Sequence, residues 1–122
     1  MAKNFKPNVG DKVSKKDAME WIDKYDKDIR KDKEKDTRSI FFGRDMLEKI
    51  LKNKTIAGIT FFFALKHNDA VKKETVQLVL VPTKEDGTHV WDDDEAAANA
   101  RVAASDGGAV AFDGGLQCPP YC

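Results

Sequence analysis

Residues 56–66 read IAGITFFFALK and residues 74–83 read ETVQLVLVPT, and these two stretches decide the fold. Both are rich in Ile, Phe, Val and Thr, which β-strands favour, and the polar segment 67–73 separates them. We therefore predict a β-hairpin with a rather long loop. Because side chains alternate between the two faces of a strand, one face forms the predicted core. That face carries Ile59, Phe61, Phe63, Leu65, Val76, Leu78 and Leu80.

The opposite face of the hairpin carries Phe62, Ala64, Val79 and Val81. It is more apolar than a sheet face open to water usually is, so we expect something to cover it. Phe62, Val79 and Val81 are the residues that we predict to form a contact face for a partner.

Two amphipathic helices are predicted before the hairpin. Ser14 is placed to cap the first, and Asp17 can reach back to it. Apolar side chains then recur at spacings of three and four and form one stripe, in which Trp21 is the expected anchor. The stripe consists of Ala18, Trp21, Ile22, Tyr25 and Ile29. In the segment 26–38, eleven of thirteen residues are charged, which is typical of a solvated helical extension.

The second helix is expected to follow Phe41, Phe42 and Gly43 and to continue to about residue 54, because apolar residues again recur at helical spacing. An aromatic pair directly before an amphipathic helix is typical of core packing, so we interpret Phe41 and Phe42 as packing residues rather than a ligand-stacking pair.

Beyond the hairpin, Asp86 and Gly87 indicate a tight turn into a third strand over 88–91. The composition then shifts to Asp, Ala and Gly, with a helix expected over 96–104 and a short strand over 109–112. The alternative is that 92–122 is disordered. We predict one α+β domain of 122 residues: a core of residues 1–91 with two N-terminal helices packed on an antiparallel three- or four-stranded meander, and a C-terminal segment 92–122.

Charge is distributed unevenly, although 21 basic and 21 acidic residues give a net charge of zero. Residues 1–55 hold 16 basic and 11 acidic side chains, whereas residues 92–122 hold one and six. Lysines that alternate with Asp and Glu produce a weak local potential, so nucleic acid is not an expected partner. No apolar run approaches a membrane span or a secretory signal, so no membrane contact is expected and the default compartment is the cytoplasm. Export without a cleaved signal would leave the same sequence.

Both cysteines of the chain lie in its last five residues, Cys118-Pro119-Pro120-Tyr121-Cys122. Two prolines in an extended path would hold the two Cα atoms roughly 12 Å apart, whereas a disulfide needs about 5.5 Å. An internal bond between Cys118 and Cys122 therefore requires a turn, for which a cis proline is the best means. Without the turn, the thiols are suited to bonding other chains or to binding zinc as a ligand pair.

No further metal ligand or catalytic group is expected. His67 and His89 are predicted at opposite ends of the hairpin, roughly 25 Å apart at 3.3 Å per residue, so they cannot complete a zinc site with the cysteines. The chain has no Gly-x-Ser-x-Gly sequence, no phosphate-binding glycine loop and no calcium-loop spacing over residues 92–95. We therefore predict no catalytic residues and no cofactor, with zinc at Cys118 and Cys122 as the exception to test.

In order, the chain has a helix with Trp21, a Phe-Gly segment opening a second helix, a Gly-Ile-Thr-Phe strand, a Leu-Val-Leu-Val strand and a closing Cys-Pro-Pro-x-Cys sequence. This order resembles a group of short uncharacterised bacterial α+β proteins that share the closing motif. The resemblance implies a shared architecture, and it implies no activity, cofactor or catalytic residue.

These patterns favour a non-enzymatic interaction or assembly module that binds a protein partner or a second copy of itself. The alternative is a thiol-based redox or metal-binding protein that acts through Cys118 and Cys122. The third hypothesis is that the protein is an enzyme, and no set of residues supports it.

Overall fold

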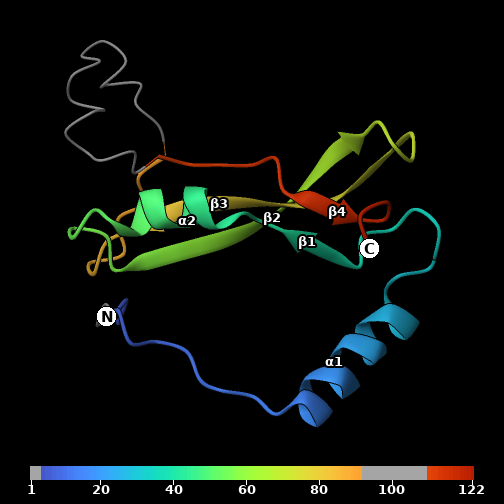
Figure 1. The fold of residues 1–122 in the computed structure, drawn as a ribbon, viewed down its shortest axis with the longest axis horizontal. Coiled ribbons are helices and arrows are strands. Elements are labelled where there is room, and N and C mark those ends of the chain that lie inside the picture. The colour runs from blue at the N-terminus through green and yellow to red at the C-terminus, as the bar shows by residue number, and fades with distance from the viewer. Residues whose placement is uncertain (1–3, 92–109) are drawn as a thin grey trace.

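The fold, seen in a computed structural model, mixes helices and strands as predicted. The structure describes residues 4–91 and 110–122. Within them the chain forms two helices and four strands that make two small antiparallel sheets (Figure 1). The elements are α1 (Lys15–Asp28), β1 (Ser39–Phe41), α2 (Arg44–Leu51), β2 (Gly58–Asn68), β3 (Lys73–Thr83) and β4 (Leu116–Cys118).

The predicted hairpin is present as β2 and β3, which pair in antiparallel register from Gly58 opposite Thr83 to Asn68 opposite Lys73. Each strand is 11 residues long, so the connecting loop is shorter than the sequence indicated. Asn68 shapes that loop, because its backbone carbonyl accepts a hydrogen bond of 2.7 Å from the Lys72 N–H and its side chain accepts one of 3.0 Å from the Ala70 N–H. The hairpin is therefore a long two-stranded ribbon with a tight end.

A continuous meander does not form in the described residues. Segment 88–91 adds a single bridge between His89 and Thr83, and Phe112 adds another to Leu80. Both bridges lie on the edge of β3 that faces away from β2. The predicted tight turn is confirmed, because Gly87 has a φ of 88° and its N–H donates a 2.9 Å hydrogen bond to the Lys84 carbonyl.

The second sheet pairs β1 with β4, from Ser39 opposite Cys118 to Phe41 opposite Leu116, and the sequence did not predict it. A three-residue strand carries too little periodicity to be recognised in sequence. Gly115 stands just before β4, and a methyl group there would overlap the side chains of Ile40 and Phe42. Its lack of a side chain therefore permits close packing. The Phe41 side chain is 64% exposed, so its assignment as a packing residue is also wrong.

The core lies where α2 covers the beginning of β2. Ile50 of α2 is completely buried and packs with Ile56, and four half-buried apolar side chains surround them, from Met46, Ile59, Val90 and Phe112. The eight residues of α2 span about 12 Å, whereas an 11-residue strand spans about 36 Å. The helix therefore covers only one end of the hairpin.

The predicted core face is consequently buried in part. Leu80 has no exposed surface and Ile59, Val76 and Leu78 are half-buried. Phe61, Phe63 and Leu65 are instead 49%, 83% and 68% exposed, so their assignment to the core is wrong. These three residues lie beyond the reach of α2.

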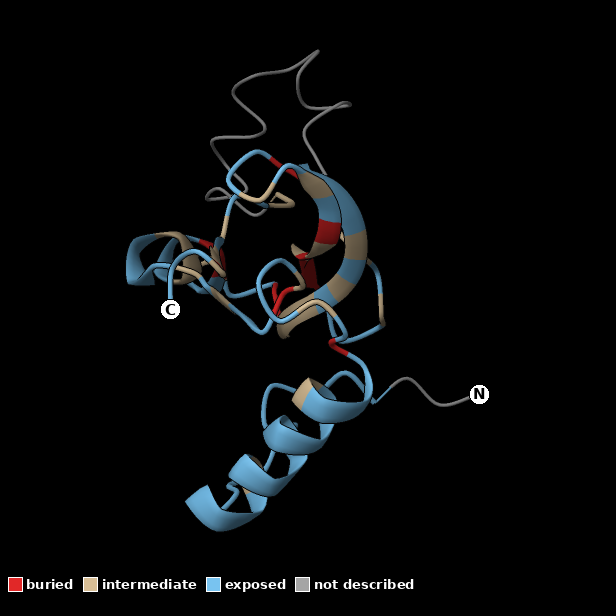
Figure 2. Cartoon of the chain, turned by 90° about the vertical axis from the view of Figure 1, so that its right-hand side faces the viewer, coloured by how far each residue is buried: buried red, intermediate tan, exposed pale blue. Residues whose placement is uncertain are grey.

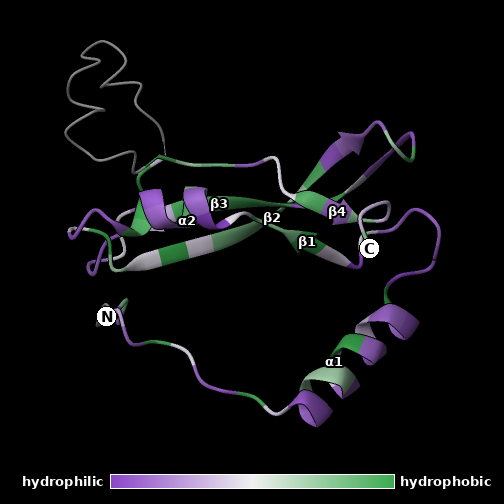
Figure 3. Ribbon diagram, viewed as in Figure 1, coloured by the Kyte–Doolittle hydropathy of each residue, from purple (hydrophilic) through white to green (hydrophobic). Residues whose placement is uncertain are grey.

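Helix α1 begins as predicted, since the Ser14 side chain accepts a hydrogen bond from the Asp17 N–H. Its apolar stripe does not pack on the hairpin, however, and no residue of α1 is buried. Trp21 is 64% exposed, so its role as the anchor is wrong. Figure 2 shows α1 standing apart from the rest of the fold, and Figure 3 shows apolar turns among its hydrophilic ones. Neither helix in the described segments has the length and apolarity needed to cross a bilayer.

The predicted helical extension over 26–38 is absent, because polar side chains satisfy its backbone in other ways. The Asp32 carboxylate accepts hydrogen bonds from the N–H groups of Glu34 and Lys35, and the Arg30 guanidinium donates to the carbonyls of Lys33 and Asp36. Such local bonds compete with helical ones. Helix α1 accordingly ends at Asp28.

The C-terminal segment is described in part. Residues 110–122 pack on the core through Phe112 and through β4. The helix expected over 96–104 lies outside the described residues.

Leu80→Ala and Phe63→Ala form a matched test of this division of the hairpin face. Leu80→Ala should lower the free energy of unfolding by about 2–5 kcal/mol, because it leaves a cavity in a fully buried site. In dilute protein, below the concentration at which copies associate, Phe63→Ala should change it by no more than about 0.5 kcal/mol, because the ring is exposed. Urea unfolding of both variants measures the difference, and equal losses would contradict the exposed position of Phe63.

Candidate functional site

The terminal cysteines are joined by a disulfide between Cys118 and Cys122, with Cα atoms 4.7 Å apart. The turn that the sequence required is present, and both the Cys118–Pro119 and the Pro119–Pro120 bonds are cis. Cys118 is 3% exposed, whereas Cys122 is exposed. One sulfur of the pair therefore belongs to a residue held inside the fold and the other to a residue open to solvent.

Backbone and side-chain hydrogen bonds tie this segment to the hairpin. The Arg38 N–H donates to the Cys118 carbonyl at 2.7 Å. Gln117, in the middle of β4, accepts through its side-chain oxygen from the Asn68 amide at 2.7 Å and from the Thr75 hydroxyl at 3.3 Å. Asn68 and Thr75 are both buried, so the cysteine pair is anchored to the far end of the β2–β3 ribbon.

A metal site is not formed among the described residues, which contain no cluster of three or more His, Cys, Asp or Glu side chains. His67 lies opposite Glu74 at one end of β3 and contacts Asp69 at 3.2 Å. His89 bridges to Thr83 at the other end. Nine residues of strand separate Glu74 from Thr83, or roughly 30 Å, so the two histidines cannot meet.

The predicted contact residues on the second hairpin face are largely covered by the chain itself. Val81 is completely buried, and Phe62 and Val79 are half-buried. The Phe62 ring packs against His89 and Trp91, with ring centroids 5.4 Å and 5.2 Å away. Segment 88–91 therefore covers part of the face that the sequence marked as needing a cover.

In the part of the chain that the structure describes, two groups of three or more large apolar side chains are exposed. We call Phe61, Phe63 and Leu65 the hairpin patch, and Trp21, Ile22, Tyr25 and Ile29 the α1 stripe. The residues of the α1 stripe are between 36% and 65% exposed. Monomeric proteins rarely expose several large apolar side chains together, so these surfaces are the strongest candidates for a binding site.

A polar cluster lies at the C-terminal end of α1. Arg30, only 7% exposed, donates to the Asp26 carboxylate and to the carbonyls of Lys33 and Asp36. A buried guanidinium is stable only with such partners. We call Arg30, Asp26, Asp36 and Lys73 the Arg30 cluster.

This cluster connects the end of α1 to β3. The Lys73 ammonium lies 2.8 Å from Asp36, and the Thr37 hydroxyl donates a 2.6 Å hydrogen bond to the Val76 carbonyl. The Tyr25 hydroxyl in turn donates to the Thr37 carbonyl at 2.9 Å. Hydrogen bonds at its C-terminal end, rather than apolar packing along its length, therefore set the position of α1.

The cluster shifts the pKa values of its two carboxylates and its lysine in directions that favour their charged forms. The hydrogen bond from Arg30 is the largest influence that lowers the pKa of Asp26 below its ordinary value of 3.8. The hydrogen bond from Lys73 is the largest that lowers the pKa of Asp36, and the same bond raises the pKa of Lys73 above 10.5.

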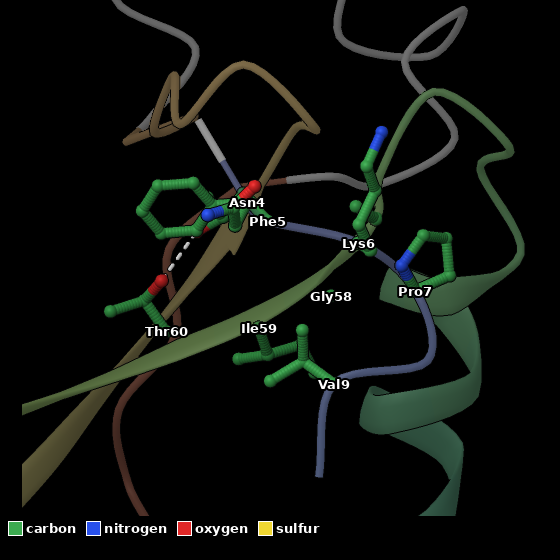
Figure 4. A pocket seen from close by; sticks show the side chains of 10 residues that line it. Asn4, Phe5, Lys6, Pro7, Val9, Gly58, Ile59 and Thr60 are labelled. Atoms are coloured by element: carbon green, nitrogen blue, oxygen red, sulfur yellow. Dashed lines mark hydrogen bonds between the residues drawn. The ribbon is translucent and has the colours of Figure 1, made fainter. Parts of the chain in front are cut away.

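An open cleft of about 480 Å³ lies between residues 4–9 and the beginning of β2 (Figure 4). Phe5, Val9 and Ile59 supply apolar walls, and Lys6 stands at its border, paired with Glu85 at 3.1 Å. The sequence did not indicate this cleft, because residues 4–9 carry no periodic pattern. Residues 57–60 and Thr83 line its other side.

Comparison with protein-family models, with curated proteins and with solved structures finds no match to this chain. Functional inference therefore depends on the geometry described above.

Lys73→Met tests the Arg30 cluster through the pKa of Asp36. The substitution removes the main influence that lowers this pKa, so the pKa should rise toward 3.8. Because a depressed carboxyl pKa stabilises the folded state above the unfolded pKa, the parent should lose that contribution as the pH falls below about 4, and the variant should lose less. Carboxyl NMR titration measures the pKa. Lys72→Met is the matched control, and an equal pKa of Asp36 in both variants would contradict the pairing.

Proposed function

We propose that this protein is a small non-enzymatic interaction module that binds a protein partner through the hairpin patch. The observation that carries the proposal is the exposure of Phe61, Phe63 and Leu65 on a strand with an unused edge. Within the described residues, β2 pairs only with β3. An open strand edge beside exposed aromatic side chains suits a partner that supplies another strand or an apolar surface.

The α1 stripe supports the same interpretation. Its aromatic members, Trp21 and Tyr25, belong to the residue types that are enriched in the centres of protein interfaces. Polar contacts position the C-terminal end of α1, and its apolar side chains are not buried against the hairpin. A second apolar surface is therefore available to a partner.

Footprinting with hydroxyl radicals tests the proposal without knowledge of the partner. Trp21 and Phe63 should react readily in dilute purified protein, because they are 64% and 83% exposed. In cells that express the protein, at least one of them should be protected several-fold. Phe41 is the control, since it is equally exposed on β1 and lies outside both surfaces. Equal reactivity of Trp21 and Phe63 inside and outside the cell would refute the proposal.

A thiol-based function is the second candidate, and the exposure of Cys122 beside a buried Cys118 favours it. Two equivalents of a small thiol would supply two electrons and two protons, giving two cysteine thiols and one small-molecule disulfide. Reduction would release residues 119–122 from their bond to β4. Since Gln117 precedes Cys118 and is bonded to Asn68 and Thr75, the end of the hairpin is the region that would respond.

Reduction should therefore raise amide hydrogen exchange in β1 and β4, and Cys122 should be alkylated faster than the buried Cys118. Exchange and alkylation are measured by mass spectrometry, with a gain of two hydrogens confirming reduction. Cys118→Ser with Cys122→Ser serves as the permanently open reference. If oxidised, reduced and double-Ser proteins exchange identically, the disulfide has no structural consequence and this candidate fails.

A further inference from the structure

The open edge of β2 has the polarity pattern of a self-complementary strand. Residues 59–65 read ITFFFAL, in which large apolar residues are placed symmetrically about Phe62: Ile59 corresponds to Leu65 and Phe61 to Phe63, while the small residues Thr60 and Ala64 correspond to each other. A two-fold symmetric contact requires that residue i meets residue j while j meets i. Two antiparallel copies of β2 meet this requirement when Phe62 lies opposite its own counterpart.

We propose that the partner is a second copy of this chain, joined by antiparallel pairing of the two β2 edges about Phe62. This inference rests on the proposed function and names the partner of the same surface. In this register Phe61 lies opposite Phe63 of the other copy and Ile59 opposite Leu65, so aromatic and aliphatic side chains pair on one face. The two hairpins then form one four-stranded sheet.

Charge permits this register. Between Gly58 and Lys66, the lysine is the single charged residue, and it lies opposite glycine in the other copy. No like charges are therefore opposed across the paired segment, a situation that would otherwise destabilise it.

The cleft fits the same arrangement. It is open between residues 4–9 and the beginning of β2, next to Ile59 (Figure 4). Because the register brings Leu65 of the other copy opposite Ile59, that side chain enters beside Phe5 and Val9, which are 43% and 73% exposed. Two-fold symmetry fills both clefts in the same way.

The area predicts a weak dimer. From the exposed fractions of the hairpin patch, Phe5 and Val9, each copy exposes on the order of 600 Å² of side-chain surface. Edge pairing buries only the flanks of these side chains, because they stand perpendicular to the sheet. A standard interface uses about 800 Å² per partner, so we expect the dimer to dissociate at low concentration.

The assembly also closes at two copies. The far edge of β3 already bonds to Phe112 and His89, with the Leu80 N–H donating to the Phe112 carbonyl at 2.8 Å. These bridges occupy the far edge of β3 near Leu80 and Thr83. The proposed contact uses the same β2 edge in both copies, so pairing produces a closed dimer rather than a fibre.

Cysteine cross-linking tests the register directly. Phe61→Cys and Phe63→Cys place thiols on exposed positions, so the fold should tolerate them. Mixed together, with one variant isotope-labelled, they should form a disulfide between copies, because the two residues face each other. Each variant alone should cross-link several-fold less, because its own counterpart is diagonal, at about 7–8 Å. Peptide mass spectrometry identifies the bond and leaves the native cysteines in place.

Native mass across a range of concentrations completes the experiment. The parent should be dimeric at high concentration, and Phe63→Lys should raise the dissociation constant of the dimer at least about tenfold. Phe41→Lys is the matched control and should leave the constant unchanged. A monomer at every concentration would overturn the dimer, and single variants that cross-link as well as the mixture would overturn its register about Phe62. Protection of Phe63 in the cell without this cross-link would keep the interaction module and reject the second copy as its partner.

Discussion

The antiparallel register of β2 and β3 is the constraint on which the rest of the structure depends. Three other parts are attached to this ribbon. Helix α2 packs on it through Ile59, and the segment after α1 is joined to it by the hydrogen bond from Thr37 to Val76. Strand β4 is joined to it by the hydrogen bonds that Gln117 accepts from Asn68 and Thr75. The ribbon is three times as long as the helix that covers it, by about 36 Å to about 12 Å. A part of its apolar face must therefore stay open unless another element reaches it.

Helix α1 does not reach it, since no residue of α1 is buried and polar contacts position its C-terminal end. The Arg30 cluster fixes the end of the helix with charged hydrogen bonds, which are directional, whereas apolar packing is not. Because Arg30 is buried, removing any partner would leave a guanidinium unsatisfied at a considerable cost. The same polar contacts that hold the helix thus leave its apolar stripe and the hairpin patch available for binding.

The sequence allowed a correct prediction of the hairpin, the start of α1 at Ser14, the helix around Ile50 and the turn at Gly87, because each has a local signal. It did not reveal β1 and β4, which are too short to show periodicity, or the end of α1 at Asp28, where bonds from Arg30 and Asp32 compete with the helix. It also left the cysteine pair undecided, because the same five residues can be extended or turned. The exposed hairpin patch was assigned to the core, since alternation shows that a face is apolar but not what covers it.

The amino-acid sequence by itself determined the two helices and the two long strands and which of their faces are apolar, because periodicity and capping act over a few residues. Only the tertiary structure decided which apolar faces are buried. That outcome depends on the lengths of elements far apart in the chain and on contacts such as the one between Asp36 and Lys73, which are separated by 37 residues. Whether a side chain is buried depends on which distant segments of the chain pack against it. Leu80 and Phe63 therefore have opposite environments, although they lie on one face of one hairpin.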